Sequence, residues 1–209
     1  MKISDPKVSK TIEYKFSKAV KESLFNNMSF TEDITDNIEV SNQTFDSCIF
    51  KEMDFYNIKF TNIELIDVIF ENCDLSNKHF DNTLIQRVKF KNCKMCGVTF
   101  IDTSIKDTSF ENCSAKYINF ASARINKMIV DESDFSEMCF QETEIKNLEL
   151  NKVDLNRAEI FKTPLKDIDV STCKIESIVV DEESLKGLII DRFQAIDLVG
   201  ILGVKLKDN

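Results

Sequence analysis

The sequence predicts an all-β solenoid of four-sided coils that ends in a short C-terminal α-helix. Two observations predict this fold: apolar residues recur every five positions, and the related stretches FENCDL, FKNCKM and FENCSA, which begin at residues 70, 90 and 110, recur every twenty. A period of five matches neither an α-helix, with about 3.6 residues per turn, nor a strand, with about 2.0. It fits a chain that turns a corner every five residues and closes one coil after four sides.

The five-residue frame is unbroken from residue 40 to residue 190. All 31 residues whose numbers are multiples of five in this range are apolar, and 14 of the 17 Phe lie on the same frame when Phe25 and Phe30 are included. Thr35 interrupts the frame, so we expect the first coils to be irregular. Residues 25–190 are therefore assigned to about eight coils, a rod of roughly 40 Å at the usual spacing between strands.

Residues twenty apart are expected to lie directly above one another. Two buried aromatic ladders follow, Phe30, Phe50, Phe70, Phe90 and Phe110 in one column and Phe60, Phe80, Phe100, Phe120 and Phe140 in another. Burial of each Phe contributes roughly 1.5–3 kcal/mol, so these ladders are expected to be the main source of stability. Ala115, between Met95 and Phe135 in its column, is expected to leave a cavity or to cause local repacking.

This pattern resembles the pentapeptide-repeat family, whose consensus is A(D/N)LXX. The resemblance covers roughly residues 25–190 and implies a right-handed quadrilateral β-helix. The slender residues two positions before each central one, such as Cys73, Val88 and Thr103, fit the small inward position of that repeat. A hexapeptide-repeat acyltransferase helix requires a period of six and a triangular cross-section, which excludes that enzymatic solenoid.

The two flanks of the repeat are expected to close the rod. Residues 1–24 form an N-terminal cap or an irregular segment. In residues 191–209, Asp191 as N-cap and Gly203 as C′ residue bracket a helix at 192–202, which caps the coils and is available for dimerisation. Val204–Leu206 could add a strand to a partner. The predicted dimer interface consists of Phe193, Ile196, Val199, Leu202 and Val204, and the alternative is a purely monomeric cap.

The C-terminal stretches TPLKDIDVSTCKI and ESLKGLIIDRFQAIDLVGILGVKL resemble the tail of the Qnr-type quinolone-resistance branch of the family. This resemblance implies a dimeric, acidic, DNA-shaped rod that binds DNA gyrase and topoisomerase IV and protects them from fluoroquinolones. Immunity proteins against gyrase poisons share a similar tail. Many Qnr proteins interrupt the frame with outward loops, whereas this frame is unbroken, so protection is expected to come from the coil faces.

The charge distribution points to a protein partner. A formal net charge of −9 argues against direct binding to nucleic acid. The cluster DESDFSE is the strongest candidate for a topoisomerase-facing surface, with its carboxylates imitating phosphates: Asp131, Glu132, Asp134 and Glu137. The alternative interpretation is a solvated face that keeps the rod in solution.

The candidates for chemistry are weak. Cys73, Cys93 and Cys113 are expected to stack in one inward column, because the same column also holds Met53, Ser133 and Val153, which shows selection for shape. The lone motif CKMC, with Cys93 inward and Cys96 outward, does not supply the four ligands that zinc requires. His79 is expected on the surface without a catalytic partner. We therefore predict no catalytic, cofactor-binding or metal site and no enzymatic activity.

The compartment follows from the ends of the chain and from its cysteines. The start, MKISDPKVSK, lacks the apolar region of a secretory signal, and no apolar run is long enough to span a membrane. Seven Cys in such a chain indicate free thiols in a reducing cytoplasm. The competing functional hypothesis is a structural, adaptor or immunity solenoid with another protein partner.

Overall fold

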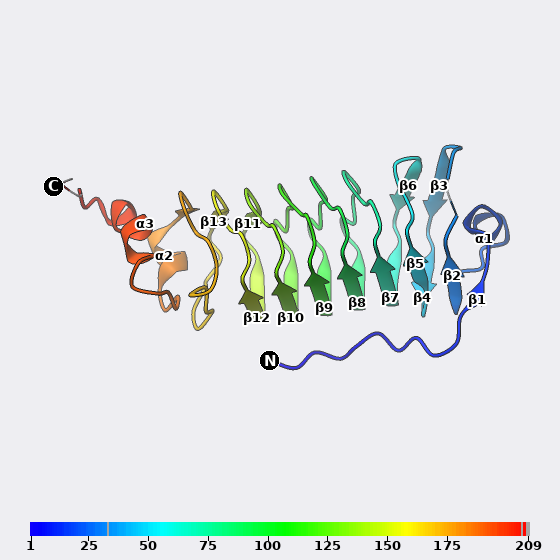
Figure 1. Ribbon diagram of the computed structural model, residues 1–209, viewed down its shortest axis with the longest axis horizontal. Coiled ribbons are helices and arrows are strands. Elements are labelled where there is room, and N and C mark those ends of the chain that lie inside the picture. The colour runs from blue at the N-terminus through cyan, green and yellow to red at the C-terminus, as the bar shows by residue number, and fades with distance from the viewer. Residues whose placement is uncertain (33, 206, 208–209) are drawn as a thin grey trace.

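The computed structural model describes residues 1–32, 34–205 and 207, apart from the side chain of Leu202, and shows one elongated rod of stacked coils (Figure 1). In chain order the elements are β1 (Ile12–Glu13), α1 (Phe16–Glu22), β2 (Met28–Phe30), β3 (Ile38–Ser41), β4 (Thr44–Asp46), β5 (Ile49–Lys51), β6 (Ile58–Thr61), β7 (Glu64–Glu71), β8 (Leu84–Lys91), β9 (Ser104–Glu111), β10 (Arg124–Asp131), β11 (Cys139–Gln141), β12 (Glu144–Asn151), β13 (Glu159–Phe161), β14 (Val179–Val180), α2 (Glu182–Leu185), α3 (Ala195–Val199) and the 3₁₀ helix η1 (Gly200–Leu202).

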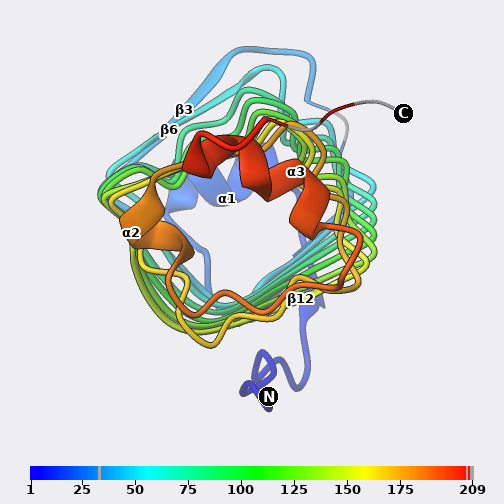
Figure 2. The same ribbon diagram turned by 90° about the vertical axis from the view of Figure 1, so that its left-hand side faces the viewer.

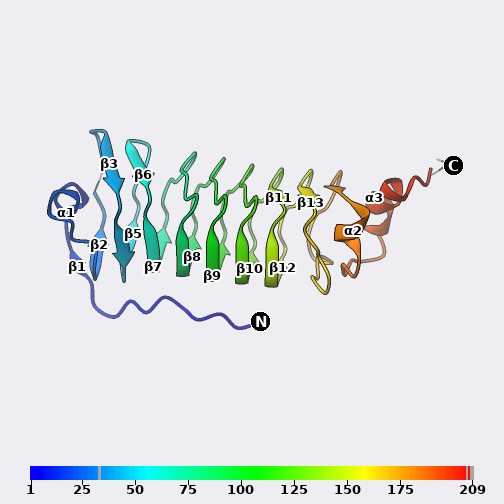
Figure 3. The ribbon, with the colours of Figure 1, turned by 180° about the vertical axis from the view of Figure 1, so that it is seen from behind.

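From β2 to β14, adjacent strands of the coils pair at a register of twenty residues, whereas β1 pairs with β2 at a register of sixteen. The main sheet has the order β1-β2-β5-β7-β8-β9-β10-β12, with β4 also paired to β7, and all of its pairs are parallel (Figure 3). Phe70 pairs with Phe90, and Phe90 pairs with Phe110. Two smaller parallel sheets, β11-β13-β14 and β3-β6, follow the same register. The predicted quadrilateral β-helix is confirmed.

Corners in the left-handed backbone region produce the four sides. In one coil Asp67, Asn72, Asn77 and Asn82 have φ values of 56°, 56°, 58° and 54°. Asn and Asp tolerate this conformation better than other residues with a Cβ, which explains why only 4 Gly suffice for so many corners. Gly97 occupies one corner where space is also short, because a Cβ there would lie 2.7 Å from Asn77 Oδ1.

Both aromatic ladders are present in the core. Ring centroids are separated by 4.8 Å between Phe50 and Phe70 and by 5.1 Å between Phe70 and Phe90, with nearly parallel planes. In the second ladder the separation between Phe100 and Phe120 is 5.2 Å. Phe60 is only half-buried, since β3 and β6 stand outside the outline of the later coils (Figure 2). The expected irregularity of the first coils is therefore visible.

Ala115, where the sequence predicts a cavity or local repacking, is fully buried. Phe135, in the next coil of that column, packs edge-on against Phe110 with centroids 5.4 Å apart. The ring of Phe135 also lies 6.3 Å from that of Phe120. The large ring above a small residue is thus accommodated by contacts with the neighbouring ladders.

The N-terminal end of the rod is closed by α1. Phe16 and Ala19 of this helix are fully buried. The ring of Phe16 lies 5.4 Å from that of Phe30 and 6.0 Å from that of Phe50, so the helix continues the aromatic core of the coils. Residues 1–11 precede it as an extended arm that runs along the outside of the rod (Figure 1).

The helices at the C-terminal end differ from the prediction in two places. A helix that the sequence does not predict lies within the repeat, and the predicted helix after the repeat is shorter. Helix α2 replaces the strand geometry on one side of the last coil, inside the range 25–190, and its N-cap Asp181 accepts the N–H of Ser184 at 2.9 Å. Asp191 is not the N-cap of the helix as predicted, since α3 begins at Ala195 with Gln194 at the N-cap position; instead Asp191 Oδ1 accepts the N–H of Gln194 at 3.1 Å across the preceding turn. Residues 192–194 form a turn, so the predicted helix 192–202 is shortened to α3 and η1. Val204 lies in no strand, and Leu206 is outside the described residues.

Candidate interaction surfaces

The stacked cysteines are structural side chains of the core. Cys73, Cys93 and Cys113 are buried free thiols. Each Sγ lies 3.5 Å from a backbone carbonyl oxygen, those of Phe50, Phe70 and Phe90 respectively. The adjacent thiol of Cys93 and burial together raise the pKa of Cys73 and of Cys113 far above the usual range, which keeps both protonated.

The other candidates for chemistry lie apart from one another. Cys96 is exposed while Cys93 is buried, so the CKMC motif does not form one site. His79 is exposed, and its Nδ1 lies 2.8 Å from Thr99 Oγ1. Within residues 1–32, 34–205 and 207, no group of three His, Cys, Asp or Glu is placed to hold a metal ion. The helices in the same ranges include none long and apolar enough to cross a membrane.

The predicted acidic surface spans one side of a coil. Asp131 ends β10, and Glu132 and Glu137 occupy the two successive corners, with φ values of 46° and 58°. Asp134 lies on the side between them, next to the buried Phe135. The four carboxyl groups therefore extend over an entire side of the coil and onto both of its corners.

Most of these carboxylates have partners within the chain. Glu132 Oε1 lies 2.7 Å from Lys152 Nζ, and Glu137 Oε1 lies 3.1 Å from Lys116 Nζ and 2.9 Å from Arg157 Nη2. Hydrogen bonds from Lys152 and from Lys116 hold the pKa of Glu132 and of Glu137, respectively, below the usual range. The surface is consequently less negative than a count of its acids suggests.

The remaining two acids of this surface accept hydrogen bonds. Asp131 accepts one from the amide of Asn151, and Asp134 Oδ1 accepts the N–H of Ser136 at 2.9 Å. Asn151 lies on the next coil, twenty residues after Asp131, and Ser136 lies two residues after Asp134. A reading of the sequence along columns of twenty would have found the inter-coil partners, since Lys152 follows Glu132 by twenty positions and Arg157 follows Glu137 likewise.

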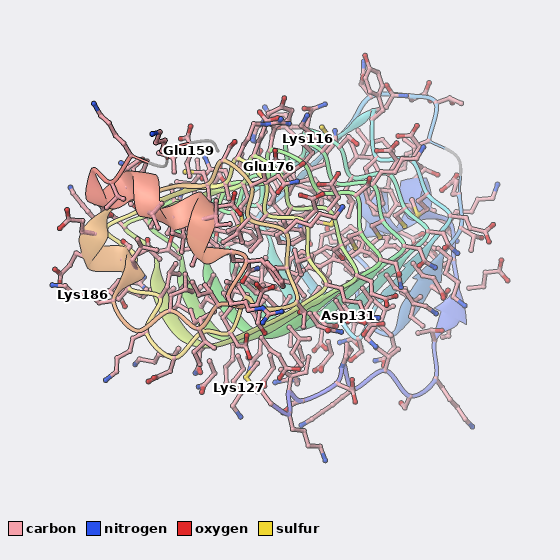
Figure 4. All side chains as sticks on the ribbon, turned by 60° about the vertical axis from the view of Figure 1, so that its left-hand side comes forward. Lys116, Lys127, Asp131, Glu159, Glu176 and Lys186 are labelled. Carbon is pink, nitrogen blue, oxygen red and sulfur yellow. The ribbon has the colours of Figure 1, made fainter. Side chains whose placement is uncertain are left out.

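Ion pairs between adjacent coils recur along the rod. Lys91 pairs with Glu71 at 3.0 Å, and Lys162 pairs with Glu142 at 2.7 Å. Figure 4 shows Lys116, Glu159 and Glu176 on one side of the rod and Lys127 on the opposite side, near the N-terminal arm. Because pairs at an exposed surface contribute little to stability, their larger effect is on the field that a partner meets.

The C-terminal end presents apolar side chains to solvent. Phe193, Ile196 and Val204 are 65%, 60% and 52% exposed, and the guanidinium of Arg192 lies 4.6 Å above the ring of Phe193. Val199 is half-buried, and the side chain of Leu202 lies outside the described residues. Beside the exposed residues is an apolar groove of about 480 Å³, lined by Glu182, Leu185, Lys186, Leu188, Ile190, Ala195, Leu198 and Val199.

A buried glutamine closes this end of the rod, which the sequence analysis did not anticipate. Gln194 is 7% exposed, and its Nε2 donates to the carbonyl oxygens of Val170 and Cys173, both at 2.8 Å. Its Oε1 accepts the N–H of Asp191 at 2.8 Å. The amide thus satisfies the carbonyl of Cys173, which has no further coil to pair with, and adds a second donor to the carbonyl of Val170, which also accepts the N–H of Cys173 at 2.8 Å.

Comparison with known proteins agrees with this architecture. Residues 63–131 match the family model of the pentapeptide repeat region. No curated protein matches the sequence of the chain. The matched segment lies within the predicted repeat region, and the fold of the coils is the one that the repeat pattern predicts.

Among solved structures, the chain is similar to QnrB1, a plasmid-mediated fluoroquinolone resistance protein. A trypsin-treated variant of QnrB1 is 20% identical, with a TM-score of 0.50, and the likeness covers 87% of this chain and 89% of that one. A second trypsin-treated variant is 18% identical over 88% and 91%, with a TM-score of 0.42. The full-length QnrB1 structure is 19% identical over 86% and 89%, with a TM-score of 0.40. At these identities the likeness concerns the fold.

Proposed function

We propose that this chain is a non-enzymatic binding protein of the Qnr type, which engages DNA gyrase and topoisomerase IV in the cytoplasm and protects them from fluoroquinolones. The observation that carries the proposal is the likeness to QnrB1, which extends over 87% of the chain. The resemblance of the C-terminal tail to the Qnr branch supports it. The outside of the rod, rather than any pocket, is the functional part of such a protein.

The acidic side of the coil is the proposed topoisomerase-facing surface. A partner that normally grips DNA presents Arg and Lys side chains in positions that fit phosphates. For these cations to reach Glu132 or Glu137, they must replace Lys152, Lys116 or Arg157. Exchange of one exposed ion pair for another requires little free energy, so the intramolecular pairs set selectivity and salt dependence rather than preventing binding.

A gyrase supercoiling assay tests this function. The purified protein is expected to reduce inhibition by a fluoroquinolone, and Glu132→Lys is expected to weaken protection several-fold because it places a cation opposite Lys152 and the partner. Glu52→Lys is the matched control, since Glu52 occupies an equivalent corner four coils away, at φ 54°. Coincident inhibition curves with and without folded protein in molar excess would reject the proposal.

Dimerisation through the C-terminal end is the second part of the proposal. The exposed side chains of Phe193, Ile196 and Val204, together with Val199 and Leu202, form the proposed interface. Ile196→Glu is expected to shift sedimentation from dimer to monomer. Ile12→Glu is the matched control at the opposite end, because Ile12 is 63% exposed and Ile196 is 60% exposed. A wild-type protein that sediments as a monomer at all accessible concentrations would refute the dimer.

The alternative is a structural, adaptor or immunity solenoid with a different protein partner. It keeps the same fold and surfaces and makes no contact with topoisomerases. A pull-down with the purified protein distinguishes the two, since recovery of gyrase or topoisomerase IV subunits is expected only for the Qnr-type function.

A further inference from the structure

The N-terminal arm is bound along the outside of the rod as an extended peptide. It starts at β1 and runs across the strands toward β12 (Figures 1 and 3). The backbone N–H of Lys7 donates to Asp67 Oδ1 at 2.8 Å, and that of Ser4 donates to Asp107 Oδ1 at 3.1 Å. The N-terminal ammonium group pairs with Glu149.

The spacing of these contacts matches the spacing of the coils. Lys7 and Ser4 are three residues apart, about 10 Å in an extended chain. Asp67 and Asp107 are separated by two coils, about 9.6 Å at the usual distance between strands. The next pair of contacts has the same spacing: Ser4 and Met1 are again three residues apart, and their partners Asp107 and Glu149 are about two coils apart. The arm can therefore place a backbone donor over every second coil without stretching.

The carboxylates that receive the arm are held in position. Asp67 and Asp107 are only 6% and 5% exposed. Arg87, on the coil between them, binds Asp67 with its Nε and Nη2 at 2.6 Å and 2.7 Å. Buried carboxylates are costly unless hydrogen-bonded: Arg87 and the N–H of Lys7 supply those bonds to Asp67, and the N–H of Ser4 supplies one to Asp107.

Apolar contacts accompany the hydrogen bonds. Ile3, Pro6 and Val8 of the arm are half-buried, and so are Ile69 and Ile129, which occupy outward-facing positions of β7 and β10. Such positions are ordinarily solvated in an antiparallel or solenoid sheet with one covered face. The outward column of the sheet between Ile69 and Ile129 also holds Lys89 and Ser109, so the strip beneath the arm is apolar at its two ends and polar between them.

Ser109 shows that this cover is not fully complementary. It occupies an outward position of β9, two residues after Asp107, yet it is 3% exposed. Within the described part of the chain, its Oγ is buried without a hydrogen-bond partner. A buried, unsatisfied hydroxyl is unfavourable, and release of the arm would let water bind it.

We infer that the strip around Asp67, Asp107 and Ser109 is a peptide-binding groove whose ligand is residues 1–8 of the same chain. The arm exchanges between a docked state and a released state, and release exposes Ile69, Ile129 and Ser109. The groove recognises an extended segment by backbone N–H groups three residues apart and by small apolar side chains between them. This inference is independent of the proposed topoisomerase function.

A thiol introduced under the arm reports its release in the full-length protein. In Ser109→Cys, the rate of thiol alkylation is read by mass spectrometry with fragment ions that separate the introduced thiol from Cys113. Cys113 is buried in the core, so its protection shows that the coils remain folded. We expect slow labelling of the introduced thiol when the arm is native.

The decisive comparison is between two substitutions of Ser4, each combined with Ser109→Cys. Ser4→Pro removes the N–H that Asp107 accepts and is expected to accelerate labelling of the introduced thiol at least tenfold, while Cys113 stays protected. Ser4→Ala keeps the N–H and is the matched control, with labelling within twofold of the native arm. Equal rates in the two variants would overturn the groove.

A synthetic peptide with the sequence MKISDPKV tests the groove directly. Added at millimolar concentration to the protein that carries both Ser4→Pro and Ser109→Cys, it is expected to slow labelling of the introduced thiol, whereas the same peptide with proline at position 4 is not. Failure of the native peptide to protect would reject a peptide-binding groove. A labelling rate that falls as the protein concentration of the native-arm variant rises would assign the bound arm to a second copy and overturn the intramolecular assignment.

Discussion

The two ends of the rod close a stack of coils in different ways. At the N-terminal end, α1 buries Phe16 completely against the rings of the first coils. At the C-terminal end, the amide of Gln194 satisfies two carbonyl oxygens, while Phe193 nearby remains 65% exposed. Hydrophobic closure uses the apolar side chains of a cap, whereas closure by hydrogen bonds leaves them free. The exposed apolar residues of the C-terminal end, Phe193 and Ile196, therefore belong to the cap itself, whereas the exposed Ile12 and Leu24 of the N-terminal end lie outside the buried face of its cap.

The N-terminal and C-terminal halves of the core also differ, in the size of their buried side chains. Fully buried Phe residues fill the N-terminal coils, and the stacked ring pairs end with Phe120 and Phe135. After Phe140 the central positions hold smaller aliphatic residues such as Leu150, Leu155 and Ile160. Since a buried Phe contributes more apolar area than a buried Leu or Ile, stability is concentrated in the N-terminal half.

The largest expected effect is at the N-terminal cap. Phe16→Ala removes a fully buried ring that lies within 6.5 Å of four others, those of Phe25, Phe30, Phe45 and Phe50. We expect it to lower the free energy of unfolding by about 3–5 kcal/mol in chemical denaturation. Phe193→Ala is the matched change at the other end and is expected to leave the stability of the monomer within about 0.5 kcal/mol. Comparable losses for the two substitutions would contradict the difference between the ends.

The second effect concerns closure by hydrogen bonds. Gln194→Leu keeps the size of the side chain but removes the donors to Val170 and Cys173. The Cys173 carbonyl loses this partner, while that of Val170 keeps the N–H of Cys173, so we expect a loss of about 1–3 kcal/mol in denaturant unfolding. Phe193→Leu, one residue away, is the control and should change little. An unchanged stability of Gln194→Leu would show that water replaces the amide at this end.

The fold could be predicted from the sequence because one rule repeats in every coil. Each central residue, from Val40 to Ile190, reports the same five-residue step, so errors at single positions such as Thr35 do not alter the conclusion. The aromatic ladders follow from the same step with a period of twenty. The five-residue step sets both the local conformation and the winding of the whole chain, so each repeat predicts the same fold.

The surfaces could be predicted only in part. The candidate acids were found as a cluster along the chain, but their partners Lys116, Lys152 and Arg157 are neighbours only across coils. The sequence gives even less indication of the docked arm. Its backbone N–H groups bind Asp67 and Asp107, and every residue except proline carries such a donor. Gln194 was overlooked because a single polar residue in an apolar stretch gives no period.

The smallest effect separates a buried ion pair from an exposed one. Arg87 holds the pKa of Asp67 below its usual value, helped by the N–H of Lys7, and the side chain of Asp67 is nearly buried. The pKa of Glu132 is also lowered, by Lys152, but this pair is open to solvent. We expect Asp67→Asn to cost about 1–2 kcal/mol at neutral pH, because the asparagine still accepts hydrogen bonds but carries no charge. Glu132→Gln is expected to cost much less.

The pH dependence of stability tests whether the ionised Asp67 stabilises the fold. A carboxyl group whose pKa is lower in the folded than in the unfolded protein stabilises the fold above its unfolded pKa, about 3.9 for Asp, and loses that contribution as the pH falls through the folded value. The wild-type protein should therefore lose stability more steeply than Asp67→Asn between about pH 4 and the folded pKa of Asp67, as measured by denaturation at a series of pH values in high salt, where exposed pairs are screened. If the free energy of unfolding fell equally steeply with pH in the two proteins, the charge of Asp67 would contribute no such stabilisation. Arg87 and the arm would then only orient this carboxylate.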